Sequence, residues 1–161
     1  MNDETKLSLG EDIPSFLMPM LEAAREQIER EHGIFSKLHL RATRIARGEA
    51  SFNLTPDEDF ADGEIIHGGV FTILLDTILA YTVWTRLDKF KPIATINLKT
   101  DYLSSVTPGT RIICDAICEG IEDDVAYCSG KATCKDTGRL IATAAGTFMV
   151  GTKGKSSGSR L

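Results

Sequence analysis

The sequence lacks the features that define several large classes of protein. It has no run of about twenty apolar residues that could span a bilayer, and residues 1–12 are acidic and polar, unlike a secretory signal. It also lacks an excess of positive charge, because its formal net charge is -5 and its basic residues are scattered. Nucleic-acid binding needs clustered cations. We therefore expect a cytoplasmic protein that binds neither nucleic acid nor membrane.

Cysteine is scarce, and no C-x-x-C pair occurs. All four cysteines lie in apolar, strand-like runs, where a thiol behaves as a small hydrophobic group. The sequence therefore predicts buried free thiols rather than a metal or redox site, and it indicates no metal and no cofactor. The four residues are Cys114, Cys118, Cys128 and Cys134.

What the sequence does contain is an ordinary globular composition. Its 161 residues are 42% hydrophobic and 25% charged, which suits one domain with one substantial core. We expect a loose leader over residues 1–12 and an amphipathic helix over about 19–32, so that residues 1–36 precede the main domain. That domain is predicted to cover residues 37–151, and the Gly/Ser/Lys-rich residues 152–161 to form a flexible tail.

Strand and helix patterns in the main domain do not alternate. Residues 38–54 alternate apolar and polar side chains and predict one long or two short strands, with a turn or bulge at Arg47-Gly48. A polar loop follows over 55–64, and then comes an apolar helix. Short turn signals separate the four strands predicted after it, which cover residues 93–104, 110–120, 125–135 and 139–150. This order favours an antiparallel α+β fold.

The predicted central helix, over residues 67–84, is apolar on nearly every side, so it should be buried. Asp76 lies in its middle, and a carboxylate there is costly unless it is hydrogen-bonded, paired or facing a cleft. Two interpretations stay open: a structural aspartate bonded to a neighbour, or a functional one. The bulky stripe on the face opposite Asp76 is predicted to pack on the sheet, and it consists of Phe71, Leu74, Ile78 and Tyr81.

His67, Gly68 and Gly69 open this helix. Unpaired backbone amides converge at a helix N-terminus, and glycines allow a ligand close to the backbone, so the site suits a polarised carbonyl or an oxyanion. A weaker explanation, common for any Gly-Gly pair, is that the two glycines only allow a tight loop-to-helix turn. Asp76 lies about 12 Å farther along the axis than Gly68. If the two act on one carbonyl, a second copy of the chain must supply one of them, which predicts a dimer.

The segment resembles the hotdog-fold thioesterases, specifically the PaaI-like branch that hydrolyses acyl- and aryl-CoA thioesters. The resemblance runs from about Leu38 to Val150 and rests on H-G-G-x6-D, here His67 to Asp76. It continues in Asp101-Tyr102-Leu103 followed by Pro108-Gly109, and in the run from Gly138 to Ala142. It implies an antiparallel sheet wrapped around a long central helix, and homodimers that often pair into homotetramers.

The resemblance also assigns roles to particular residues. Gly68 would donate its amide to the thioester carbonyl, and Asp76 of the opposite subunit would act as nucleophile or general base. Thr95 is the nearest match to an assisting hydroxyl, while His67 and Gly69 would contact substrate.

Three further points concern substrate binding. Many relatives carry an asparagine before H-G-G, where this chain has Asp62-Gly63. Asp62 can accept but not donate hydrogen bonds when ionised, and its other interpretation is a turn residue. Lys99 is a candidate for the CoA diphosphate, or an ordinary solvated charge.

The function that this resemblance implies is acyl-CoA thioesterase activity without a metal. The alternative is a non-catalytic acyl-CoA-binding module, which the missing asparagine favours and Asp76 disfavours. The final residues, Ser159-Arg160-Leu161, resemble a peroxisomal targeting signal, which gives an alternative to the cytoplasm.

Overall fold

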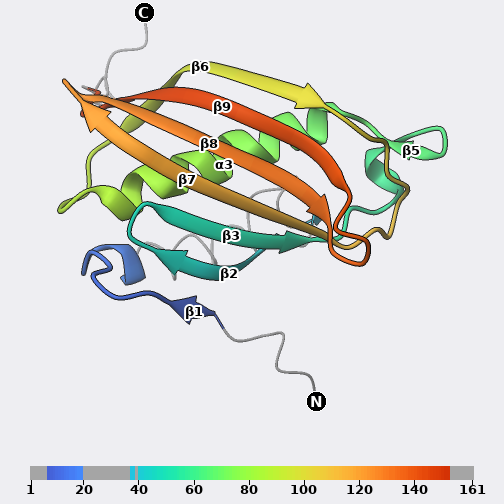
Figure 1. Cartoon of the computed structure of the whole chain (residues 1–161), viewed down its shortest axis with the longest axis horizontal. Coiled ribbons are helices and arrows are strands. Elements are labelled where there is room, and N and C mark those ends of the chain that lie inside the picture. Colours follow the sequence, from blue (N-terminus) through green and yellow to red (C-terminus); the bar gives the residue numbers. More distant parts are fainter. Residues whose placement is uncertain (1–6, 20–36, 39, 153–161) are drawn as a thin grey trace, which may run out of the picture.

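The computed structural model describes residues 7–19, 37–38 and 40–152. A seven-stranded sheet curves around one long helix, α3 (Gly69–Arg86), which runs behind the strands in Figure 1. The strand order across the sheet is β1-β2-β3-β7-β8-β9-β6. A separate two-stranded hairpin, β4 (Ala61–Asp62) and β5 (Ile65–Ile66), precedes α3. The strands of the large sheet are β1 (Ser8–Leu9), β2 (Arg41–Ala46), β3 (Glu49–Leu54), β6 (Ile93–Tyr102), β7 (Ile112–Glu122), β8 (Val125–Cys134) and β9 (Leu140–Val150).

The predicted α+β architecture is confirmed. All strand pairs of the large sheet are antiparallel except β1–β2, which is parallel. The turn predicted at Arg47-Gly48 joins β2 to β3, and Gly48 has a φ of 76° that favours glycine. The expectation of a loose leader over residues 1–12 is wrong for Ser8 and Leu9, which pair with Arg44 and Ile45 of β2. Of the helix predicted over 19–32, the structure describes only Pro19, which is helical; residues 20–32 and the tail from residue 153 lie outside the described residues.

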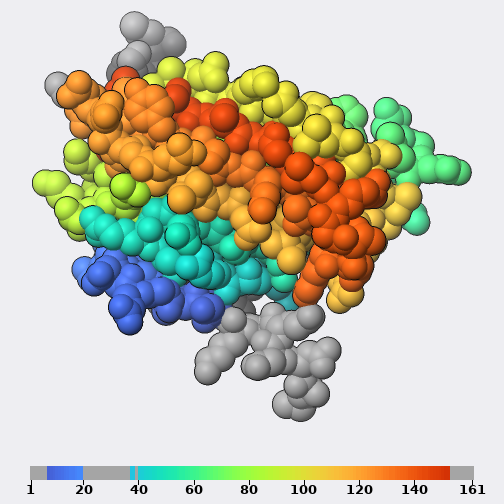
Figure 2. Space-filling view, viewed as in Figure 1, coloured from blue at the N-terminus to red at the C-terminus, as the bar shows by residue number. Residues whose placement is uncertain are grey.

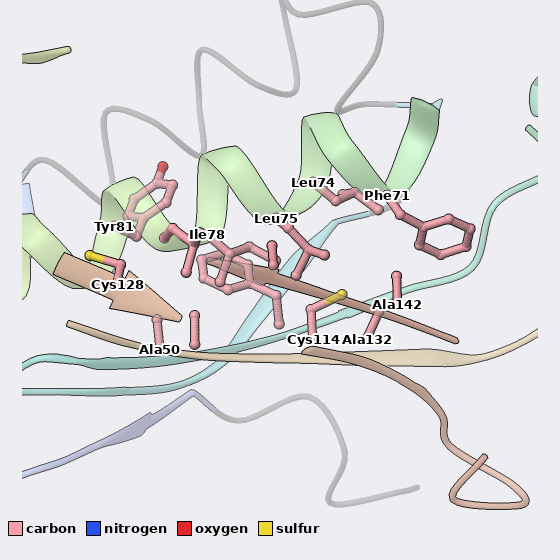
Figure 3. Close-up of a cluster of buried hydrophobic side chains, with 14 of the residues drawn as sticks. Ala50, Phe71, Leu74, Leu75, Ile78, Tyr81, Cys114, Cys128, Ala132 and Ala142 are labelled. Carbon is pink, nitrogen blue, oxygen red and sulfur yellow. The ribbon is translucent and has the colours of Figure 1, made fainter. Parts of the chain in front are cut away.

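The core lies between α3 and the concave face of the sheet. Phe71, Leu74, Ile78 and Tyr81 are all buried, as predicted for the stripe opposite Asp76, and Figure 3 shows this cluster along the helix beside the strands. Small residues on β8 and β9 let the helix approach closely. A Cβ on Gly130 would lie 3.2 Å from Leu79 Cδ2, and one on Gly146 would lie 3.5 Å from Leu79 Cδ1. The helix therefore has one well-defined resting position on the sheet.

Strand β6 forms one edge of the sheet and carries a bulge. Its pairing with β9 shifts register between Thr95 and Asn97, so Ile96 is an extra residue. Before the bulge Thr95 pairs with the buried Phe148, and after it Tyr102 pairs with the buried Ala142. Directly paired residues share a face of the sheet. The bulge therefore keeps both Thr95 and Tyr102 on the side of α3, although seven positions separate them.

The convex face of the sheet forms the surface in Figure 2, where side chains of the orange and red strands β7, β8 and β9 cover most of the view. A shallow hollow of about 590 Å³ lies on this face. Ser51, Asp115 and Lys131 are among its lining residues, and they occupy the strand positions that alternate with the buried ones. The hollow is therefore on the opposite side of the sheet from α3. No described helix is long and apolar enough to cross a membrane.

Candidate active site

The carboxylate in the middle of α3 is held by the neighbouring edge strand. Thr95 of β6 donates a hydrogen bond from Oγ1 to Asp76 Oδ1 at 2.9 Å. Asp76 is half-buried and Thr95 is exposed. A carboxylate has about four lone-pair sites, so a single hydroxyl leaves most of its acceptor capacity free. The structure thus brings together two residues that the sequence analysis proposed, and it leaves the carboxylate able to bind water or a reacting group.

The N-terminus of α3 presents one backbone amide without an internal partner. His67 Nδ1 accepts a hydrogen bond from the Gly69 amide at 3.0 Å, and the Val70 amide bonds to the His67 carbonyl at 3.0 Å. Within the described residues, the Gly68 amide has no such partner. Gly68 is the N-cap of α3, where the helix dipole is positive. Gly68 therefore remains the donor best placed to receive a carbonyl oxygen or an oxyanion.

His67 has a defined role in this arrangement. Its Nδ1 is an acceptor toward Gly69, which requires the neutral imidazole with its proton on Nε2. The ring nitrogen that caps the helix is therefore not available to take a proton from water. Sequence reasoning grouped His67 and Gly69 as substrate contacts; the structure joins them to each other, and this hydrogen bond uses the Gly69 amide.

Tyr102 and Thr72 complete the wall beside Gly68. The Tyr102 hydroxyl lies 2.5 Å from Thr72 Oγ1, one helical turn after the glycines. A Cβ at Gly68 would lie 3.2 Å from Tyr102 Cε1, so the ring covers the glycine closely. In the sequence Tyr102 stands out only as part of a motif, with no role of its own. Strand alternation alone would place Tyr102 and Thr95 on opposite faces, so the bulge at Ile96 concealed this contact.

The two remaining predicted site residues lie away from this cluster. Asp62 is exposed in the β4–β5 hairpin, opposite Ile65 and next to Gly63, whose φ is 66°. This placement fits the interpretation of Asp62 as a turn residue. Lys99 pairs with Asp101 at 2.8 Å and is 72% exposed. It pairs in register with Ala145, between the inward-facing Leu98 and Thr100, so it points to the convex face of the sheet.

Other basic residues near the end of α3 are engaged in structural contacts. Arg86 donates from Nη1 to the Cys118 carbonyl at 2.9 Å, and Lys91 lies 3.7 Å from Asp124. No group of three or more His, Cys, Asp or Glu in the described ranges is arranged to hold a metal ion. The chemistry available at the described site is thus one carboxylate, one free amide and several hydroxyls.

Comparison with known proteins supports the assignment of family and fold. Residues 63–141, which include Gly68, Asp76 and Thr95, match the family model of the thioesterase superfamily. A search of curated protein sequences finds no match.

Solved structures share the fold at low sequence identity. Zebrafish thioesterase superfamily member 2 superposes with a TM-score of 0.73 at 18% identity, covering 83% of this chain and 97% of that one. The Escherichia coli PaaI protein from the phenylacetic acid degradation operon gives 0.70 at 16% identity, covering 84% and 94%. A Streptococcus mutans protein bound to acetyl-CoA gives 0.65 at 18% identity, covering 72% and 91%. The predicted hotdog fold is therefore confirmed, and the family-model match supports the resemblance to the thioesterases.

Proposed function

The chain is a hotdog-fold protein of the thioesterase superfamily over residues 63–141, and from this premise we propose that it hydrolyses acyl-CoA or aryl-CoA thioesters to the free acid and CoA. One observation carries the proposal. The carboxylate of Asp76, which within the described residues accepts a hydrogen bond from Thr95 alone, lies on the helix that begins with the unpaired Gly68 amide. A carboxylate and an oxyanion donor are the two groups that acyl transfer to water requires.

In the proposed mechanism the thioester carbonyl accepts a hydrogen bond from the Gly68 amide. The positive end of the α3 dipole stabilises the negative charge that develops on this oxygen. Asp76 then either attacks the carbonyl carbon or removes a proton from the attacking water. Thr95 orients the carboxylate in both routes. When Asp76 attacks, loss of the CoA thiolate leaves a mixed anhydride, which water hydrolyses to the free acid and the regenerated carboxylate. When Asp76 acts as a base, water adds to the carbonyl carbon, the C–S bond breaks, and the proton taken from water passes to the CoA thiolate. The CoA thiol is the product that an assay detects.

We further propose that each site is shared by two subunits. Gly68 and Asp76 are about 12 Å apart along one helix, too far to act on one carbonyl. The exposed edge of β6 offers a way to join two copies, because no described strand pairs with its other side and it is ten residues long. Antiparallel pairing of two β6 edges about a two-fold axis places Thr95 of one copy opposite the Tyr102 end of the other. Asp76 of one subunit then approaches Gly68 of the partner.

The proposed assembly therefore contains at least a homodimer, and a homotetramer formed by two such dimers fits the resemblance. Light scattering coupled to size-exclusion chromatography measures the state directly. A monomer that is fully active would contradict the shared site.

The activity is tested by incubating the purified protein with a panel of acyl- and aryl-CoAs and following thiol release. Turnover of at least one thioester by the wild type, with loss of turnover in Asp76→Ala, is the expected result. If no thioester is cleaved although acyl-CoA binds by calorimetry, the chain is a non-catalytic acyl-CoA-binding module. The observation that favours this alternative is that no asparagine lies in the few residues just before His67, where the exposed Asp62 stands instead.

The shared site is tested by complementation. Asp76→Asn chains are co-expressed with Gly68→Pro chains, each carrying a different affinity tag, and the mixed dimer is isolated. Proline removes the amide hydrogen, and its ring suits the observed Gly68 φ of -55°. In a shared site, a mixed dimer has one intact site and so recovers about half of the wild-type activity. If both groups came from one chain, no mixed dimer would recover activity.

A further inference from the structure

Two of the four buried cysteines face each other across neighbouring strands. Cys118 of β7 pairs directly with Cys128 of β8, and both side chains point into the core, with 0% and 4% exposure. The other two cysteines have no such partner, since Cys114 pairs with Ala132 and Cys134 with Ile112. From the sequence all four thiols look alike, because spacing along the chain does not reveal which residues meet across a sheet.

The backbone of this pair has the geometry that brings side chains closest. The Cys118 amide bonds to the Gly48 carbonyl at 2.7 Å, and its carbonyl accepts from Arg86 at 2.9 Å. Both groups therefore point away from Cys128, which makes this a non-hydrogen-bonded pair of the antiparallel ladder. Such pairs have Cα atoms about 4.5 Å apart. This separation lies within the range of about 4.4–6.8 Å that a disulfide can bridge.

The surroundings distinguish the two sulfurs. The hydrogen bond from the Cys128 thiol, helped by the nearby Arg86, lowers the pKa of Cys118, while the same bond and burial raise the pKa of Cys128. Thr82 Oγ1 lies 3.7 Å from Cys128 Sγ. By contrast, burial raises the pKa of Cys114 to about 12. Cys118 is thus the sulfur of the pair that reacts first as a thiolate.

We propose that Cys118 and Cys128 form a redox-sensitive pair, which a peroxide converts into an intramolecular disulfide between β7 and β8. The Cys118 thiolate attacks one oxygen of hydrogen peroxide and breaks the O–O bond, giving a sulfenic acid and, after protonation, water. The Cys128 thiol loses its proton, its sulfur attacks the sulfenic sulfur, and the S–O bond breaks to release a second water. Two thiols are oxidised and one peroxide is reduced to two waters. A dithiol reductant reverses the reaction.

The site is independent of the proposed hydrolysis. It lies under the last turns of α3, beside Thr82 and Arg86, whereas Asp76 and Gly68 lie in the first half of the helix. Figure 3 labels Cys128 on the strand that lies below this end of the helix. Both thiols are buried, so the reaction is expected to be slower than for an exposed thiol.

The test uses the folded full chain treated with hydrogen peroxide, quenched, unfolded and titrated for free thiols. The thiol count is expected to fall from four to two and to recover with dithiothreitol. Trypsin leaves Cys114, Cys118 and Cys128 in one peptide, because the chain has no Lys or Arg between Ile112 and Ser129. Cleavage after Asp115, Glu119 and Glu122 with an acid-specific protease separates them. A linked pair of peptides then identifies the bond by mass spectrometry.

The matched variants are Cys118→Ser and Cys114→Ser. Cys118→Ser should lose no pair of thiols under the same treatment, whereas Cys114→Ser should still form the bond. Retention of four thiols in the oxidised wild type, a bond between other cysteines, or irreversible oxygen addition would overturn the proposal. The wild-type result alone decides this, whether or not the variants fold, and no step depends on thioesterase activity.

Discussion

The two halves of α3 carry similar polar side chains but use them in opposite ways. In the second half, Thr82 and Thr85 are completely buried and each donates to a carbonyl one turn back, at 2.7 Å. In the first half, Thr72 and Asp76 reach across to β6 and remain partly accessible. A buried hydroxyl that is satisfied within its own helix serves stability. A carboxylate that bonds outward and keeps acceptor sites free is suited to chemistry.

The largest effect that this comparison predicts is at Asp76. Asp76→Asn keeps the size of the side chain and can still accept from Thr95 but removes the carboxylate. We expect kcat for the best acyl-CoA to fall by about 10²–10⁴-fold. Thermal unfolding should change little, because the site is half-buried and near a surface edge. If the variant instead unfolds at a clearly lower temperature and hydrolyses acyl-CoA at the wild-type rate, Asp76 is a structural residue, and the two halves of α3 do not differ in the way proposed.

The next effect concerns the amide at Gly68. Gly68→Pro removes the donor, and we expect kcat to fall by about 10²–10³-fold, the usual cost of losing one oxyanion donor. Gly68→Ala is the matched variant, because it adds the same Cβ beside Tyr102 but keeps the N–H. Gly120→Ala is a neutral control, since nothing lies within 4 Å of its Cβ position. Equal rates for the Pro and Ala variants would show that the amide does not take part.

In the second half of α3 the prediction concerns stability rather than rate. Thr85 Oγ1 accepts from the Gly48 amide at 2.9 Å and so fixes the β2–β3 turn. Thr85→Val leaves that amide without a partner, which should cost about 1–3 kcal/mol in the free energy of unfolding. Urea denaturation measures this loss. The kcat of the folded protein should be retained. A variant with unchanged stability but lower kcat would show that the second half of α3 serves the reaction rather than stability.

The smallest expected effect is at Thr100 on β6. Its buried Oγ1 has no hydrogen-bond partner among the described residues, so Thr100→Val removes no hydrogen bond. We expect the free energy of unfolding to stay within about 0.5 kcal/mol of the wild type or to rise, because an unsatisfied buried hydroxyl is itself unfavourable. Urea denaturation of this variant and of Thr85→Val compares the same substitution at a hydroxyl without a partner and at a hydrogen-bonded one. A loss as large as that of Thr85→Val would mean that the hydroxyl does have a partner.

Much of the fold could be predicted because its elements have simple periodicities. The all-round apolar helix, the four strands after it and their turns follow from apolar spacing and from residues such as Gly48 and Asp124. The site was reached through resemblance, which named Gly68, Asp76 and Thr95 before the contact between the last two was visible.

What sequence reasoning missed depends on contacts between distant strands or within a single turn. Two residues of β1 pair in parallel with β2, too short a segment to have a period. The bond between His67 and Gly69 depends on ring orientation. The facing of Cys118 and Cys128 depends on the β7–β8 register, which one residue of slippage would abolish.

The extra residue in β6 also means that distance along the chain is a poor guide to which side chains share a face of this strand. Seven positions separate Thr95 from Tyr102, and only the bulge at Ile96 puts both on the side of α3. Without Ile96 six positions would separate them, and plain alternation would keep each residue opposite its present partner on β9. Two chains that differ by one residue in this edge strand could thus present the same two side chains to the helix.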